Sequence, residues 1–124
     1  MTPGSALFCL ALNIYHEARG EPKSGQIAVA MVTMNRAEWV PGKVCQVVYE
    51  RGQFSWTDSK RNKTPREPQA WKKAQAVARG VIDGEHPDIT QGATHFHAKR
   101  VRPLWTQRLE KTVRIGDHIF YTQR

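Results

Sequence analysis

The sequence predicts an α+β fold in a single domain, residues 1–124, with a mainly helical body and a small antiparallel β element. Three observations support this prediction. Apolar residues recur at helical spacing through the first two-thirds of the chain, β-prone segments gather in the last third, and the length suits one hydrophobic core. Helical and β-rich parts that are separated along the chain are typical of the α+β class.

Three helices are expected in the first two-thirds of the chain. The first covers residues 5–19 and ends at Gly20, and Pro22 prevents its simple continuation. The second covers residues 24–39, before a Pro-Gly pair that closes it. The third covers residues 68–84, with a proline in its first turn and a glycine as its C-terminal cap.

The segments between and after these helices are less regular. Residues 44–49 suit either a short helix or a strand, and the polar residues 51–67 suit a long irregular connection of the kind that carries function. Three strands are expected at 94–98, 112–115 and 118–121. Gly116 and Asp117 between the last two fit a two-residue hairpin turn.

The chain is strongly basic, with a formal net charge of +8. Such a charge favours a polyanionic partner: nucleic acid, an anionic membrane or an acidic cell envelope. The basic residues are scattered and no nucleic-acid motif accompanies them, so we expect a solvated basic surface and no nucleic-acid partner. The longest apolar stretch, Ala6–Leu12, is too short to cross a bilayer and lacks a basic segment before it, so we expect neither stable membrane insertion nor a signal peptide.

The chain holds two cysteines, Cys9 and Cys45. Two cysteines make neither a disulfide framework nor a four-thiolate zinc site. Both suit buried small hydrophobic positions, and a single bridge between them stays open.

Glu17 is the first candidate for a catalytic acid. It continues the helical stripe of Leu10 and Ile14 toward the core. Burial would raise the pKa of this carboxyl toward neutrality and allow it to donate a proton. The alternative is an exposed glutamate that pairs with Arg19.

Metal and nucleophile chemistry find little support in the sequence. His16 and Glu17 begin like an HExxH zinc motif, but Gly20 stands where the second histidine is required. A metal held by His95, His97 and His118 stays open, although histidines among aromatics more often stack or form hydrogen bonds. No Gly-x-Ser-x-Gly elbow or Cys-His pairing is evident. We expect neither a metal nor a cofactor.

Aromatic and hydrogen-bonding residues accompany the acid and suit a groove for sugar rings, because aromatic faces fit the apolar faces of sugars and carboxylic acids cleave glycosidic bonds. These residues are Tyr15, Asn35, Gln53, Phe54, Trp56, Phe96, His97, Trp105 and Tyr121.

Seven sequence blocks, in order, resemble the SleB-type cell-wall hydrolases, which include spore-cortex-lytic enzymes and some phage endolysins. The blocks are Ala11–Glu21, Gly25–Ala30, Asn35-Arg36, Gln53–Trp56, Gly92–Ala98, Pro103 with Trp105, and Gly116–Tyr121. The resemblance implies a lysozyme-like domain with Glu17 as catalytic acid, which cuts peptidoglycan between N-acetylmuramic acid and N-acetylglucosamine. Hydrolysis and anhydro-forming transglycosylation both stay open. The expected substrate-binding residues are Tyr15, Glu21, Gln53, Phe54, Trp56, His97, Trp105 and Tyr121.

A second carboxylate, which a two-acid glycosidase requires, has no convincing candidate among Glu21, Asp58 and Asp88. We expect Glu21 to orient local groups or cap the following helix, and Glu17 alone to be indispensable.

The expected partner is the glycan strand, and the expected state is a monomer. With no signal peptide or wall-binding module, the chain looks more like a phage endolysin, held in the host cytoplasm before it acts on the wall or periplasm, than like a spore enzyme. A trimmed piece of an exported protein is the other interpretation. Two other functions stay open: an N-acetylmuramoyl-L-alanine amidase and a non-catalytic basic module that binds wall polymer or nucleic acid.

Overall fold

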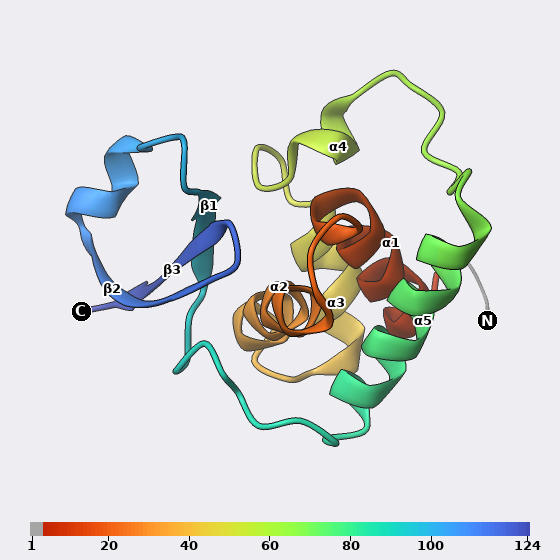
Figure 1. Cartoon of the computed structure of the whole chain (residues 1–124), viewed down its shortest axis with the longest axis horizontal. Coiled ribbons are helices and arrows are strands. Elements are labelled where there is room, and N and C mark those ends of the chain that lie inside the picture. The colour runs from red at the N-terminus through yellow and green to blue at the C-terminus, as the bar shows by residue number, and fades with distance from the viewer. Residues whose placement is uncertain (1–3) are drawn as a thin grey trace.

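A computed structural model describes residues 4–124 and confirms the α+β class, with helices on one side of the molecule and a small sheet on the other (Figure 1). The elements in chain order are α1 (Ala6–Ala18), α2 (Lys23–Arg36), α3 (Pro41–Val48), α4 (Ser55–Asp58), α5 (Pro68–Ile82), β1 (His95–Ala98), the 3-10 helix η1 (Leu104–Gln107), β2 (Leu109–Ile115) and β3 (His118–Gln123).

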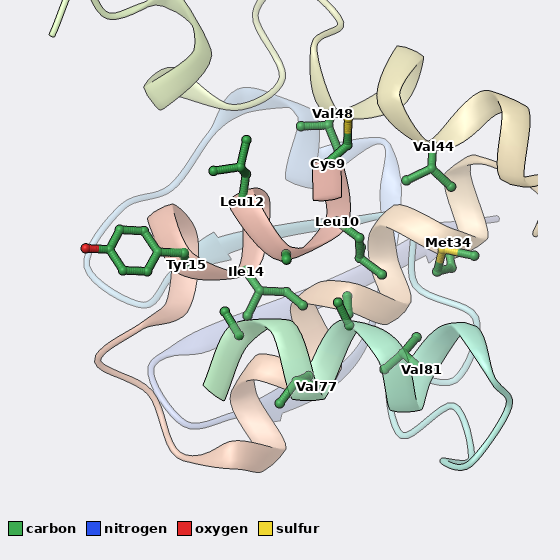
Figure 2. Packing of buried hydrophobic residues seen from close by; sticks show 14 of the residues in the cluster. Cys9, Leu10, Leu12, Ile14, Tyr15, Met34, Val44, Val48, Val77 and Val81 are labelled. Carbon is green, nitrogen blue, oxygen red and sulfur yellow. The ribbon is translucent and has the colours of Figure 1, made fainter. Parts of the chain in front are cut away.

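Helix α1 is the centre of the helical body and packs against α2, α3 and α5. It begins where predicted, because the Oγ of Ser5 accepts a hydrogen bond of 3.0 Å from the Phe8 N–H and so caps the helix. Leu10 and Ile14 are fully buried, and Figure 2 shows them among side chains from α2, α3 and α5. The predicted apolar stripe of α1 therefore faces the core.

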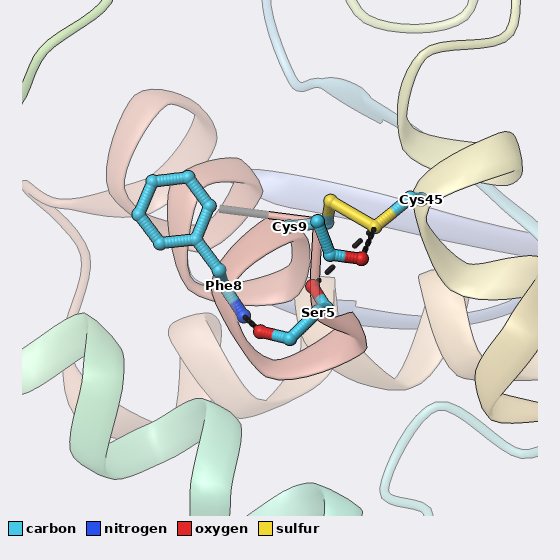
Figure 3. Close-up of a disulfide and its surroundings, with 5 residues drawn as sticks. Ser5, Phe8, Cys9 and Cys45 are labelled. Carbon is cyan, nitrogen blue, oxygen red and sulfur yellow. Dashed lines mark hydrogen bonds between the residues drawn. A yellow bond between two sulfur atoms is a disulfide. The ribbon is translucent and has the colours of Figure 1, made fainter. Parts of the chain in front are cut away.

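A disulfide between Cys9 and Cys45 joins α1 to α3 (Figure 3). The bridge lies in the first half of α1, well before the turn that carries Glu17. The structure thus resolves the alternative that the sequence left open.

The three-stranded sheet is antiparallel in the order β1-β3-β2. The β2–β3 hairpin turns at Gly116 and Asp117 as predicted, and Gly116 has a φ of +58°, which glycine adopts easily. Phe120 of β3 is fully buried and packs with Ala28 and Val32 of α2 in a second, smaller core cluster. This cluster attaches the sheet to α2.

The structure corrects some expectations about the helices and resolves one alternative. Helix α2 ends at Arg36 and not at residue 39, because Glu38 and Trp39 both adopt positive φ angles. Of the two alternatives for residues 44–49, the helix is present: α3 ends at Val48, and Tyr49 is its C-cap. Pro41 opens this helix at its first turn instead of closing α2. The 51–67 connection is irregular except for the single turn of α4. Across residues 4–124, no helix has the length and apolar character needed to span a membrane.

Candidate active site

Glu17 lies on the last turn of α1 and faces a cavity of about 470 Å³ between the helical body and the sheet. Arg19 does not neutralise it: Arg19 Nε lies 2.6 Å from the Glu67 carboxylate instead. Burial raises the pKa of Glu17 from its ordinary value of 4.5 to about 7. The carboxyl is therefore suited to hold and release a proton near neutral pH.

Five of the residues expected to form the sugar groove line the cavity with Glu17, namely Gln53, Phe54, Phe96, His97 and Trp105. Phe54 is buried and its ring lies 6.3 Å from that of Phe96, whereas Gln53 is exposed at the rim. The Trp105 ring, on η1, lies 5.8 Å from His97 and closes the opposite wall. An acid beside aromatic walls is the arrangement that the residue types had suggested.

His97 has a defined tautomer. Its Nδ1 lies 2.8 Å from the Ala98 carbonyl oxygen, which can only accept, so Nδ1 carries the hydrogen. In the neutral ring Nε2 then accepts from the Tyr121 hydroxyl at 3.0 Å. Tyr121 itself is not among the lining residues and supports His97 from behind.

Glu21 also lies outside the cavity and connects the turn between α1 and α2 to the β2–β3 hairpin. Its Oε1 accepts a hydrogen bond of 3.1 Å from the Asp117 N–H and lies 3.3 Å from His118 Nδ1. The His118 ring lines the Glu17 cavity, and burial lowers its pKa against the opposing effect of the Glu21 charge. Glu21 thus holds a cavity residue without facing the cavity.

Tyr15 and Trp56 are not brought to this cavity. The Tyr15 hydroxyl accepts hydrogen bonds of 3.1 Å from the backbone N–H groups of Arg66 and Glu67, and Figure 2 shows it directed away from the core. The Trp56 indole donates to the buried side chain of Asn13 at 2.8 Å. Both residues line a second cavity on the other side of α4.

Comparison with known proteins identifies the family. The model of the family described as Cell Wall Hydrolase matches residues 20–121, which is most of the chain. The chain belongs to the cell wall hydrolase family. The family model begins three residues after Glu17, so the match itself does not include the acid.

This cell wall hydrolase is similar to spore cortex-lytic enzymes: 34% identical to that of Halalkalibacterium halodurans and 32% to that of Bacillus subtilis, over 90% of its own length. It spans about a third of the length of those relatives, 33% and 35%.

Two solved structures confirm the lysozyme-like fold. The catalytic domain of the germination-specific lytic transglycosylase SleB from Bacillus anthracis aligns with a TM-score of 0.75 at 30% identity, over 94% of this chain and 93% of that one. The catalytic domain of the Bacillus cereus SleB protein aligns with a TM-score of 0.73 at 30% identity, over 94% and 89%. The resemblance stated from the sequence is confirmed.

Sequence reasoning gave Arg36 no role in the hydrolase site and considered His95 only as a possible metal ligand. Arg36 lines the cavity, donates to the Thr94 carbonyl oxygen at 3.3 Å and lies 2.7 Å from the Glu50 carboxylate. It also donates to His95 Nε2 at 3.3 Å, so His95 Nδ1 carries the hydrogen and donates to the Thr94 hydroxyl. The resemblance to the family included the Asn35-Arg36 block, which could have marked Arg36 as functional. The block alone does not show that Arg36 contacts Thr94 and His95.

The other acids considered from the sequence lie away from Glu17. Asp88 accepts hydrogen bonds from the Asn35 side chain at 2.9 Å and the Gly92 N–H at 3.0 Å, so it holds the loop before β1. Asp58 is exposed on α4. Within residues 4–124, no three or more His, Cys, Asp or Glu side chains come together in a way that could hold a metal ion.

Proposed function

We propose that residues 1–124 form a peptidoglycan-cleaving catalytic domain that cuts the bond between N-acetylmuramic acid and N-acetylglucosamine by lytic transglycosylation, with Glu17 as its single catalytic carboxyl. One observation carries this proposal: Glu17 is the only carboxylic acid among the described residues that line the cavity. Two-carboxylate glycosidases place a second acid across the scissile bond. A cavity with one carboxyl favours a nucleophile that the substrate itself supplies.

The proposed reaction uses Glu17 first as an acid and then as a base. The protonated carboxyl donates its proton to the glycosidic oxygen as the bond from that oxygen to muramic C1 breaks. The C6 hydroxyl oxygen of the same muramic residue then bonds to C1, and the Glu17 carboxylate takes the hydroxyl proton. The products are a 1,6-anhydromuramic end and a free N-acetylglucosamine hydroxyl, and Glu17 is again protonated.

The walls of the cavity suit a sugar strand. Phe54 and Trp105 offer aromatic surface to the apolar faces of the rings, and Gln53 at the rim offers amide hydrogen bonds. His97, with its tautomer fixed by Ala98 and Tyr121, adds an oriented imidazole. These four residues are the proposed substrate contacts.

Product analysis tests the reaction. Purified peptidoglycan is digested and the fragments are read by mass spectrometry, and we expect anhydromuramic ends. Reducing muramic ends, heavier by one water, would instead indicate a muramidase and require a second carboxylate or a positioned water. Freed stem peptides on intact glycan would indicate an amidase and overturn the proposal.

The activity should fall as the pH rises above about 7. The first step requires the protonated carboxyl, and the pKa of Glu17 is raised to about 7, so the competent fraction decreases through that pH. Above it we expect kcat/KM to drop about tenfold per pH unit, as for any single required proton. Initial rates on solubilised peptidoglycan across this range measure the effect. A decline that begins near pH 4.5 would show that Glu17 titrates like an exposed glutamate.

Glu21→Gln should impair activity much less than loss of Glu17. The amide keeps an oxygen that can accept the Asp117 N–H but loses the charge beside His118, so the hairpin should loosen. We expect a loss of about 1.5–3 kcal/mol in the free energy of unfolding, the range for hydrogen bonds to charged groups. Denaturation and initial rates measured on the same preparation separate the two effects. Equal losses of activity in Glu17→Gln and Glu21→Gln, with folding intact, would contradict the assignment of roles.

The biological setting is a further part of the proposal. The net charge of +8 supports action on an anionic cell wall, by attraction that added salt should weaken. A role as an endolysin and a monomeric state stay predictions. Lysis of cells by the added protein, with and without membrane permeabilisation, tests the first, and sedimentation tests the second.

A further inference from the structure

A second cavity, larger than the Glu17 cavity, lies on the other side of α4. Its volume is about 840 Å³, and it is bounded by the last turn of α1, by α4 and by residues 59–67. In Figure 1 this segment leaves α4, arches away from the helical body and returns at α5. None of the residues proposed for catalysis or sugar binding lines this cavity.

The last turn of α1 holds the wall of this cavity in place. The Tyr15 hydroxyl accepts from the backbone N–H groups of Arg66 and Glu67, and His16 Nε2 forms a hydrogen bond of 2.9 Å with the Lys63 carbonyl oxygen. The His16 ring also stacks on Trp56, with ring centroids 4.4 Å apart. The turn that presents Glu17 to one cavity therefore shapes the other.

The second cavity is positively charged. Four of its lining residues are cationic, namely Arg19, Arg61, Lys63 and Arg66, and Glu67 is the one carboxylate among the described lining residues. Arg19 pairs with Glu67, and Lys63 Nζ donates to the Thr57 carbonyl oxygen at 2.8 Å. In the part of the chain that the structure describes, the guanidinium groups of Arg61 and Arg66 lie within 4.0 Å of no carboxylate. Two planar cations are thus free for an anionic ligand.

The two cavities adjoin. Ser55 lines both, and Trp56 beside it forms part of the wall of the second. A strand that places its muramic ring near Glu17 therefore has the cationic cavity one short helix away. In that substrate, the anions nearest to the cleaved bond are the carboxylates of the peptide on the muramic lactyl group.

We propose that the second cavity binds these stem-peptide carboxylates, with Arg61 and Arg66 as the anchoring cations. The inference rests on the proposed function, because it assumes a glycan strand in the Glu17 cavity. It predicts that the enzyme prefers strands that carry peptides over bare strands.

Binding measurements test this separately from catalysis. Glu17→Gln protein is titrated, by calorimetry, with soluble glycan chains that carry stem peptides and with the same chains stripped by an amidase. Stripping leaves a lactyl carboxylate on each muramic residue, so the comparison isolates the carboxylates of the peptide itself. We expect the peptide-bearing chains to bind about tenfold more tightly or better, in keeping with two charge-assisted contacts. Adding Arg61→Gln and Arg66→Gln should abolish this preference and leave the affinity for stripped chains unchanged.

The control adds Arg79→Gln and Arg108→Gln, which remove the same charge from exposed positions outside both cavities. Retained preference in this control supports the site. If both pairs of arginine substitutions weakened the binding of peptide-bearing chains equally, net charge alone would explain the preference, and the proposal would be overturned. A phosphate-rich wall polymer is titrated in the same way, and tighter, arginine-dependent binding of that polymer than of peptide-bearing chains would overturn the proposal too.

Glycan products report on the proposed reaction, and glycan affinity reports separately on the second cavity. Products other than cleaved glycan ends would overturn the proposed reaction. The arginine-dependent preference for peptide-bearing chains is instead measured as binding affinity in the Glu17→Gln protein, which lacks the catalytic acid. In otherwise wild-type protein, loss of Arg61 and Arg66 should raise KM for intact peptidoglycan by about tenfold and leave kcat unchanged, as for a contact made equally in the ground and transition states.

Discussion

Replacing Glu17 by glutamine is expected to lower kcat/KM on peptidoglycan by about 10²- to 10⁴-fold, the contribution typical of a positioned general acid. Glutamine matches glutamate in size and keeps an amide that can form hydrogen bonds, but it has no proton to donate to the glycosidic oxygen. Because Glu17 is the only carboxyl among the described residues of the cavity, no neighbour there can replace it. Release of soluble muropeptides by wild type and variant at about pH 6, where Glu17 is mainly protonated, measures the loss.

The stability of the same variant supplies the control. The pKa of Glu17 is raised in the folded chain, so the native state binds more protons than the unfolded state between pH 4.5 and about 7. Ionised Glu17 therefore weakens folding as the pH rises through this range, and glutamine removes that effect. Above neutral pH the variant should unfold at a denaturant concentration no lower than wild type. A variant that is folded and still active would exclude Glu17 as the acid.

The sequence was sufficient to predict that Glu17 faces inward, because the helical repeat fixes which residues share a face of α1. Once Leu10 and Ile14 face the core, a residue three positions later must lie near that face, and burial then raises its pKa. The hairpin turn at Gly116 was predictable for a similar reason, because it depends on a local φ angle that glycine adopts easily.

The functional assignments that the sequence could not settle depend on partners far along the chain. Tyr15 is two positions from Glu17, but these two positions lie on different faces of α1, and only the fold shows that its hydroxyl holds Arg66 and Glu67. Trp56 was equally suited to a sugar groove until the buried Asn13 appeared as the partner of its indole. Aromatic composition indicates a binding protein but does not say which cavity each ring joins.

Glu21 shows how the two ends of the chain form one site. Its carboxylate binds the Asp117 N–H, 96 positions away, and lies against His118, whose ring reaches the Glu17 cavity. An alanine at Gly116 would place its Cβ 3.0 Å from the Glu21 carboxylate, in a residue with positive φ. The glycine therefore permits both the turn and the close approach of Glu21. This contact explains why the first and last sequence blocks belong together.

Loss of the Cys9–Cys45 disulfide is expected to lower the free energy of unfolding by about 2–4 kcal/mol, the typical contribution of a native bridge. The bridge closes a loop with a sequence separation of 36 and so restricts the unfolded chain. Cys9 lies two helical turns before Glu17, and neither cysteine lines the Glu17 cavity, so activity below the unfolding transition should persist.

Urea denaturation of the wild-type chain with and without a thiol reductant measures this effect without changing a side chain. The matched control is the Cys9→Ala, Cys45→Ala variant, in which the reductant should change nothing. The free energy of unfolding of the variant should also be somewhat lower than that of the reduced wild type, because Cys9 is buried and alanine leaves a small void in its place. Coincident unfolding curves for oxidised and reduced wild type would show that packing of α1 on α3 alone holds the two helices together. Loss of glycan cleavage on reduction, with the fold intact, would instead connect the bridge to the position of Glu17.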